Sequence, residues 1–162
     1  MSDSIAVLVH QLAERLLAKK LIMATAESCT GGWIAQCLTA EAGSSNWFDT
    51  GFVTYSNAAK QRLLAVPAAY FALEGPGAVS EETVLAMTQG AIANSRANVA
   101  VAVSGIAGPD GGSQEKPVGT VWIGWQWEDK ATAKCFHFSG DREAVRLATV
   151  AAALQGSVTL VG

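Results

Sequence analysis

Histidine is scarce in this chain, since its 162 residues include only His10 and His137. The two histidines lie far apart and form no pair at metal-ligand spacing. The three cysteines, Cys29, Cys37 and Cys135, are also widely separated and form no CxxC motif. This pattern argues against a disulfide framework and against a thiolate zinc site, and it favours a reducing cytoplasm.

Positive charge and long apolar runs are limited as well. The chain has 11 Lys and Arg against 14 Asp and Glu, a net charge of -3, and its basic residues occur singly or in pairs. Proteins that follow a phosphate backbone concentrate basic residues on one surface, so we expect no nucleic-acid partner. Residues 1–20 lack the basic start and continuous apolar core of a secretory signal. No segment has the length of a membrane span, and we expect no membrane partner.

Apolar sequence, by contrast, is abundant and makes up half of the chain. A chain of this length hides roughly two thirds of its surface in one domain, which we expect to cover residues 1–162. Apolar spacing and cap residues predict helices over 4–19, 32–40, 58–65 and 80–97, and a last helix capped by Ser139 or Asp141. Strand patterns cover 21–26, 51–56, 98–105, 118–127 and 132–140. The alternation followed by a hairpin predicts an α/β fold, a three-layer α/β/α sandwich around a mixed sheet.

The first strand of the predicted hairpin is apolar on both faces. Val121, Ile123, Trp125 and Trp127 share one face, and Trp122 lies on the other. Both faces therefore need cover from helices or from a second subunit. With five tryptophans in the chain, this pattern favours a homodimer.

Lysine is the candidate base in a chain with so little histidine. Lys60 stands three residues after Asn57, the expected N-cap of a short helix. The positive end of the helix dipole lowers the pKa of an amine at that position, and a neutral amine can accept a proton from a hydroxyl. A solvated surface lysine is the alternative interpretation, and Tyr55 has a similar alternative as a core aromatic on a strand.

The candidate nucleophiles are Ser28, Cys29, and Ser44 or Ser45. A thiol near a helix N-terminus becomes more acidic and more reactive, which favours Cys29. Buried thiols and turn serines more often have structural roles, which applies to every candidate. Spacing alone leaves the choice open.

Two glycine-rich turns, AESCTGG at 26–32 and SGIAGPDGG at 104–112, each follow a predicted strand. Such turns offer unpaired backbone N–H groups to an anion, although neither has Walker A or dinucleotide-fold spacing. The candidate binding residues in them are Glu27, Ser28, Thr30, Gly31, Ser104, Gly105 and Gly108. Arg142, in the first turn of the last helix, is a candidate phosphate clamp.

Nearly the whole chain resembles the family of the C-terminal domain of competence/damage-inducible protein A. The motifs that carry the resemblance are AESCTGGWIA at 26–35, GSSNWFDTGFVTYSNAAK at 43–60, GAVSEETV at 77–84, SGIAGPDGGSQEKPVGTVW at 104–122 and FSGDREAVR at 138–146. Stand-alone bacterial members of this family are nicotinamide-nucleotide amidases. The resemblance implies hydrolysis of the carboxamide of nicotinamide mononucleotide to nicotinic acid mononucleotide and ammonia, with no metal or redox cofactor.

The resemblance also implies a set of catalytic residues. It places the serine nucleophile at Ser45, the base at Lys60 and an assisting tyrosine at Tyr55, with Arg142 reaching the nucleotide substrate. Longer members carry an additional N-terminal domain, and we expect none of its activity here. Two other functions stay open: a non-catalytic nucleotide-binding sensor or partner module, and an amidase for another pyridine or ribosyl carboxamide.

Overall fold

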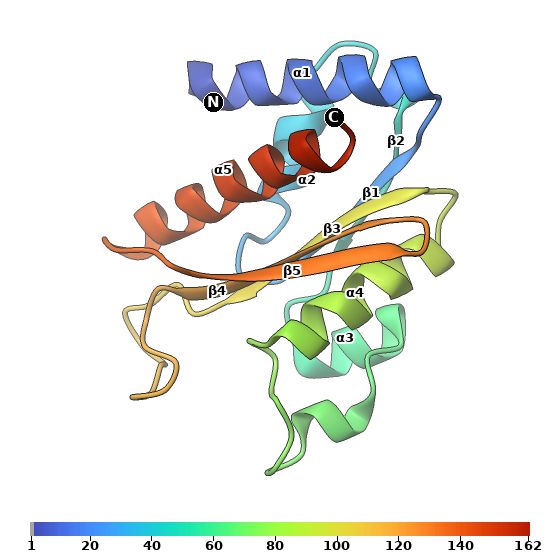
Figure 1. Ribbon diagram of the computed structural model, residues 1–162. Coiled ribbons are helices and arrows are strands. Elements are labelled where there is room, and N and C mark those ends of the chain that lie inside the picture. The colour runs from blue at the N-terminus through green and yellow to red at the C-terminus, as the bar shows by residue number, and fades with distance from the viewer. Residues whose placement is uncertain (1) are drawn as a thin grey trace.

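The computed structural model describes residues 2–162 and shows a mixed β-sheet between two layers of helices (Figure 1). The strands are β1 (Met23–Glu27), β2 (Phe48–Val53), β3 (Val99–Gly105), β4 (Thr120–Trp127) and β5 (Lys130–His137). The helices are α1 (Asp3–Lys19), α2 (Trp33–Thr39), α3 (Asn57–Leu64), α4 (Glu81–Ala93) and α5 (Arg142–Leu160), with 3-10 turns η1 (Ser44–Asn46) and η2 (Ala68–Phe71). The predicted α/β/α sandwich is confirmed.

The strand order is β2-β1-β3-β4-β5, and the first three strands are parallel. β4 runs antiparallel to β3 and forms the expected hairpin with β5. Because β1, β2 and β3 point the same way, their carboxyl ends meet at one edge of the sheet. The segments 28–32, 54–56 and 106–119, which follow these strands, are therefore brought together.

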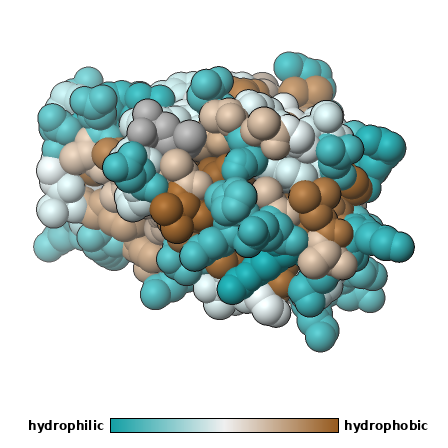
Figure 2. Space-filling view, turned by 90° about the horizontal axis from the view of Figure 1, so that it is seen from above, coloured by the Kyte–Doolittle hydropathy of each residue, from teal (hydrophilic) through white to brown (hydrophobic). Residues whose placement is uncertain are grey.

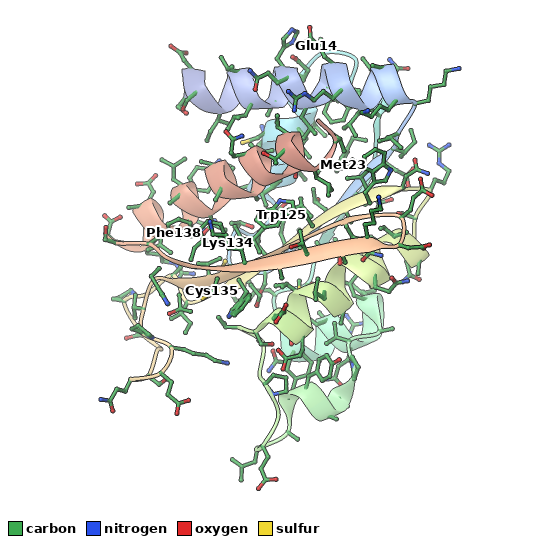
Figure 3. The ribbon with its side chains drawn as sticks, in the orientation of Figure 1. Glu14, Met23, Trp125, Lys134, Cys135 and Phe138 are labelled. Carbon is green, nitrogen blue, oxygen red and sulfur yellow. The ribbon has the colours of Figure 1, made fainter. Side chains whose placement is uncertain are left out.

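Helices α1, α2 and α5 cover one face of the sheet, and α3 and α4 cover the other (Figure 1). Trp125 lies between the sheet and α5, where its indole N–H donates to the carbonyl of Ala153 at 3.0 Å (Figure 3). Trp122 packs on the opposite face, against the apolar cluster under α4. The expectation that β4 is apolar on both faces is confirmed, because each face meets a helix layer.

The start of α3 differs from the prediction. Ser56 is the N-cap, since its hydroxyl accepts the Ala59 N–H at 3.0 Å, and Asn57 is the first helical residue. Serine and asparagine cap equally well, so local preference could not choose between them. The end of β2 decides: pairing with β1 stops at Val53, which leaves Tyr55 in the connection rather than in a strand.

Two other helix ends were also predicted from cap residues. Asp141 caps α5 as expected, because its carboxylate accepts the Ala144 N–H at 2.9 Å. Helix α4 ends at Ala93 rather than near residue 97, since the chain must turn there to enter β3. Ser95 stabilises that turn by donating to the carbonyl of Ala91 at 2.7 Å.

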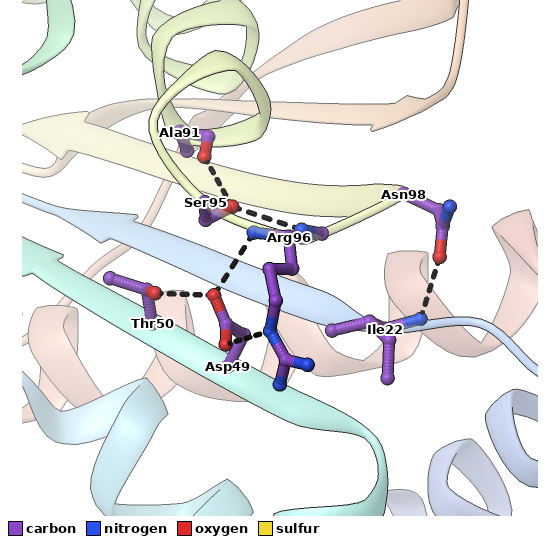
Figure 4. A network of polar contacts seen from close by, with 8 residues as sticks. Ile22, Asp49, Thr50, Ala91, Ser95, Arg96 and Asn98 are labelled. Carbon is purple, nitrogen blue, oxygen red and sulfur yellow. Dashed lines mark hydrogen bonds and ion pairs between the residues drawn. The ribbon is translucent and has the colours of Figure 1, made fainter.

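The amino end of the sheet is closed by a polar network around Asp49, at the start of β2 (Figure 4). Its carboxylate accepts the backbone N–H of Arg96 at 3.0 Å, the Arg96 Nε–H at 3.1 Å and the Thr50 hydroxyl at 2.8 Å. These three bonds lower the pKa of Asp49, and the bond from the Arg96 backbone N–H has the largest effect. Nearby, the side-chain oxygen of Asn98 accepts the Ile22 N–H at 2.9 Å. The network ties β2 to the turn before β3 and leaves the carboxyl edge free for a site.

Seen from the α1 side, the surface is mostly hydrophilic, with apolar side chains only in small groups (Figure 2). Within residues 2–162, no helix has both the length and the apolar character needed to cross a bilayer.

Candidate active site at the carboxyl edge of the sheet

A cavity of about 280 Å³ opens at the carboxyl ends of β1 and β3. Its wall comes from the turn after β1, the β2–α3 connection, the segment before α4, the loop after β3 and the start of α5. The lining residues are Ser28, Cys29, Tyr55, Asn57, Lys60, Ala78, Val79, Ser104, Gly105, Ile106, Ala107, Gly108, Asp110 and Arg142. The parallel strand ends thus bring several predicted residues into one site.

Lys60 is the charged group at the bottom of this site, and only 1% of its surface is exposed. Its Nζ donates to the Ser28 hydroxyl at 3.0 Å and to the backbone carbonyl of Tyr55 at 3.0 Å. Both partners are neutral, so neither compensates an ammonium charge. Burial lowers the pKa of Lys60 from 10.5 to about 8. The direction of this shift agrees with the prediction from sequence, but its main cause is desolvation rather than the helix dipole.

Ser28 is the hydroxyl that faces the amine. It follows β1 directly, and its N–H donates to the Val103 carbonyl at 3.1 Å, which fixes its backbone against β3. Its own carbonyl accepts the Gly31 N–H at 3.1 Å and closes a tight turn. Gly31 at φ +61° and Gly32 at φ +104° allow the chain to enter α2 at once. A strand, a turn and a helix therefore hold this serine at the cavity, the arrangement of many nucleophilic serines.

Glu27 was a candidate binding residue, but the structure turns it away from the cavity. It is fully buried and accepts the Thr30 hydroxyl at 2.6 Å, the Ile34 N–H at 2.9 Å and the Ala35 N–H at 3.0 Å. The last two N–H groups lie at the start of α2 and have no partner within the helix. A carboxylate at that position is also stabilised by the helix dipole. Glu27, Thr30 and Gly31 therefore shape the turn and do not line the cavity.

Ser45 lies far from Lys60, which corrects the expected pairing. It sits exposed in η1, before β2, whereas Lys60 follows β2. A strand rises about 3.3 Å per residue, so β2 alone separates them by on the order of 20 Å. Within one chain, Ser45 cannot exchange a proton with this amine. The hydroxyl beside Lys60 is instead that of Ser28, one of the alternatives that the sequence left open.

Cys29 also lines the cavity, next to Ser28. Burial is the main cause that raises the pKa of its thiol, to about 11. Because the thiolate is the reactive form, this shift makes Cys29 a weak nucleophile near neutral pH. The advantage that a helix N-terminus offers to a thiol is thus outweighed by desolvation.

The mouth of the cavity is bridged by Tyr55 and Arg142. Arg142 donates from Nη1 to the Gly108 carbonyl at 2.8 Å and from Nη2 to the Tyr55 hydroxyl at 3.3 Å. Tyr55 is 62% exposed, so it is not the core aromatic of the alternative interpretation. Ser104, Gly105 and Gly108 line the cavity beside this bridge, as expected for the second glycine-rich turn.

Some lining residues escaped the sequence interpretation. Asn57 was assigned only a capping role, and Asp110 had no role within its glycine-rich loop. Ala78 and Val79 come from the irregular segment 65–79, where no local pattern indicates a site. The signal for them was indirect, because both belong to the GAVSEETV motif that carries the family resemblance.

A family model described as the CinA C-terminal domain matches residues 5–160. The chain belongs to the CinA C-terminal domain family. It is 53% identical to "Nicotinamide-nucleotide amidohydrolase PncC" of Pseudomonas putida over 98% of both chains. The Escherichia coli K12 protein of that name is 51% identical over 91% of this chain and 89% of its own.

Other members are similar in structure or carry more sequence. The crystal structure of competence/damage inducible protein CihA from Agrobacterium tumefaciens has a TM-score of 0.95 and 43% identity, covering 100% of this chain and 98% of that one. A CinA-like protein of Geotalea daltonii is 53% identical over 82% of this chain but only 32% of its own length. The CinA domain thus also occurs within longer proteins.

Replacement of Lys60 tests the burial of its amine through the pH dependence of stability. The folded pKa of about 8 lies below the ordinary 10.5, so between these values the unfolded chain binds more protons. The free energy of unfolding of the wild type should therefore rise with pH in this window, by at most about 1.4 kcal/mol per pH unit. Lys60→Met should be more stable at pH 7.5 and should lose this rise, as measured by urea unfolding at pH 7.5, 8.5 and 9.5.

The matched control is Lys130→Met, which removes an exposed amine at the β4–β5 turn. It should keep the wild-type pH dependence. If Lys60→Met showed the same slope as the wild type, the amine would be titrating as it does in water.

Proposed function

We propose that this protein is a nicotinamide-nucleotide amidase, which hydrolyses nicotinamide mononucleotide to nicotinic acid mononucleotide and ammonia in pyridine nucleotide recycling. Near full-length relatives at 51% and 53% identity carry the name of that activity, which supports the reaction class. The observation that carries the chemical proposal is the 3.0 Å contact between Lys60 Nζ and the Ser28 hydroxyl in the cavity. An amine with its pKa near neutrality beside a hydroxyl is a general base beside a nucleophile.

The first half of the reaction forms an acyl-enzyme. Neutral Lys60 takes the proton of Ser28 as its oxygen attacks the carboxamide carbon. The carbonyl oxygen becomes an oxyanion, and the N–H of Cys29, the residue after the nucleophile, is positioned to donate to it. Lys60 then returns the proton to the amide nitrogen, the carbon–nitrogen bond breaks, and ammonia leaves.

The second half uses the same groups on water. Lys60, neutral again, takes a proton from a water molecule that attacks the acyl carbon, and the proton passes to the Ser28 oxygen as the ester bond breaks. Nicotinic acid mononucleotide leaves, and both side chains return to their starting forms. No cofactor enters either half.

Substrate binding must supply a large part of the acceleration. General-base action is worth about 10²–10⁴-fold, and an oxyanion donor about 10²–10³-fold. Arg142 is the proposed clamp for the substrate phosphate, because its guanidinium lies at the cavity mouth and can bind oxygens with two parallel bonds. Tyr55 orients both basic side chains, since its carbonyl accepts from Lys60 and its hydroxyl accepts from Arg142. Ser104, Gly105 and Gly108 complete the proposed binding wall.

Substitution of the candidate nucleophiles tests this assignment. Ser28→Ala should lower kcat for ammonia release from nicotinamide mononucleotide by more than about 10³-fold, because no acyl-enzyme can form. Ser45→Ala, the matched serine control outside the cavity, should keep wild-type kcat, and Cys29→Ala should keep most of it. Full activity of Ser28→Ala would refute the mechanism.

The two alternative functions have tests of their own. Binding of the nucleotide in calorimetry without any release of ammonia would indicate a sensor module. Activity confined to nicotinamide or its riboside would indicate another carboxamide substrate.

The pH profile of kcat/KM tests the base independently. Because Lys60 must be neutral to act, kcat/KM should rise with pH and level off above its pKa of about 8. Below that value each pH unit should cost about tenfold. A flat profile from pH 6.5 to 9, with no viscosity effect on the rate, would contradict a lysine base.

We also propose a cytoplasmic homodimer. The cytoplasm is supported by Cys29, Cys37 and Cys135, which are all free thiols. The dimer is supported by an apolar hollow of about 470 Å³ between β5 and α5, lined in part by Trp125 and Phe136. Sedimentation equilibrium should give twice the mass of the chain, and a monomer at micromolar concentration would rule the dimer out.

A further inference from the structure

The turn that carries Ser28 is held from outside by an arginine of α5. Arg146 donates from Nε to the carbonyl of Cys29 at 3.0 Å and from Nη2 to the carbonyl of Thr30 at 3.2 Å. Residues 28–32 are called the Ser28 turn below. Two successive carbonyls of the Ser28 turn therefore point at one guanidinium, although Arg146 itself does not line the cavity.

The guanidinium is itself fixed in place. Its central carbon lies 5.4 Å from the centre of the Trp33 ring, within the range of a cation–π contact. Val145 and Thr149, on the same helix, are buried and anchor α5 in the core. A planar fork with several donors matches two adjacent carbonyls, which the single ammonium of lysine does not. The contact thus has the geometry of a clamp rather than of a solvated side chain.

The clamp acts on the central peptide of the turn, between Cys29 and Thr30. Cys29 and Thr30 are the central residues of the turn closed by the bond between Ser28 and Gly31. The two common forms of such a turn differ by a flip of the central peptide, and the second form requires positive φ at its third residue. Thr30 has no positive φ, and Arg146 holds the Cys29 carbonyl in the orientation of the first form. A flip would break this bond and reverse the dipole next to the Cys29 N–H.

The backbone N–H groups of Cys29 and Thr30 have no oxygen acceptor within residues 2–162 of the protein. Those of Ser28 and Gly31, by contrast, are bonded. An unbonded N–H next to the nucleophile is available to a developing oxyanion only while the turn keeps its shape. Glu27 holds the buried side of the turn through the Thr30 hydroxyl, and Arg146 holds the other side.

We propose that Arg146 is a positioning residue, which keeps Ser28 and the Cys29 N–H in reactive geometry; the proposal rests on the function proposed above. Its role differs from that of Arg142, one helical turn earlier on α5. Arg142 lines the cavity and meets the substrate, whereas Arg146 acts only through the Ser28 turn. Loss of Arg142 should therefore raise KM, and loss of Arg146 should lower kcat.

Steady-state kinetics of Arg146→Ala and Arg146→Lys test the assignment. Both should lower kcat by about 10²-fold, the cost of a displacement near 1 Å, because neither side chain spans the two carbonyls. KM should stay within about threefold of wild type, since no cavity contact is lost. Added guanidinium ion at millimolar concentration should restore part of the kcat of Arg146→Ala. The matched control is Arg15→Ala, which removes an arginine bond of 2.6 Å to the Val158 carbonyl, far from the cavity.

Arg15→Ala should keep wild-type kcat, and guanidinium should not raise the rates of Arg15→Ala or of Arg142→Ala. A kcat of Arg146→Ala within twofold of wild type, or a loss confined to KM, would overturn the proposal. If Arg146→Ala does not fold, Arg146→Lys decides in the same way.

Hydrogen exchange separates this proposal from the proposed function. The amides of residues 28–33 should exchange faster in Arg146→Ala than in the wild type or in Arg15→Ala, whether or not the protein releases ammonia. If the wild type released no ammonia but Arg146→Ala still exchanged faster than the wild type in this segment, the proposed function would be refuted and the clamp would stand. Unchanged exchange in this segment would refute the clamp.

Discussion

A lysine amine withdrawn from water must either find a counter-charge or give up its proton, because an unpaired ammonium in the interior is strongly disfavoured. Lys60 meets a hydroxyl and a backbone carbonyl, both neutral. The pKa of the amine falls to about 8 for this reason, mainly through burial. A carboxylate in the same position would have kept the ammonium and removed the base. The chemistry of the site thus depends on the neutral character of both Lys60 partners as much as on the burial of the amine.

The sheet provides this environment through the order of its strands. β1 lies between β2 and β3, so the turn that carries Ser28 ends beside the connection that leads to Lys60. β3 contributes the glycine-rich loop on the other side. Helix α5 reaches the same edge and brings Arg142 to the cavity mouth and Arg146 to the back of the Ser28 turn. Each group at the site comes from a different segment, and only the parallel arrangement of the strands brings them together.

Three successive residues, Glu27 at the end of β1 and Ser28 and Cys29 in the Ser28 turn, have separate tasks. Ser28 faces the amine, Cys29 presents a thiol whose raised pKa makes it a weak nucleophile near neutral pH, and Glu27 points inward to the start of α2. Alternation of side chains along a strand explains why Glu27 and Ser28 face different ways. A carboxylate pointing outward here would have lain near Lys60 and favoured its protonated form. Its burial against the start of α2 stabilises that helix and keeps the carboxylate away from Lys60.

The sequence by itself determined the order of helices and strands, because apolar periodicity and cap residues report local preference. It also singled out Lys60 as a candidate base, Arg142 as a candidate phosphate clamp, the two glycine-rich turns and a short set of candidate nucleophiles. Only the tertiary structure decided that Ser28, not Ser45, meets the amine, since the extended length of β2 carries Ser45 to the opposite end of the sheet. It also decided the inward turn of Glu27 and the clamp from Arg146, 117 residues away from Cys29 in the chain. Local patterns carry no record of such distant contacts or of burial, and burial is what lowers the pKa of Lys60.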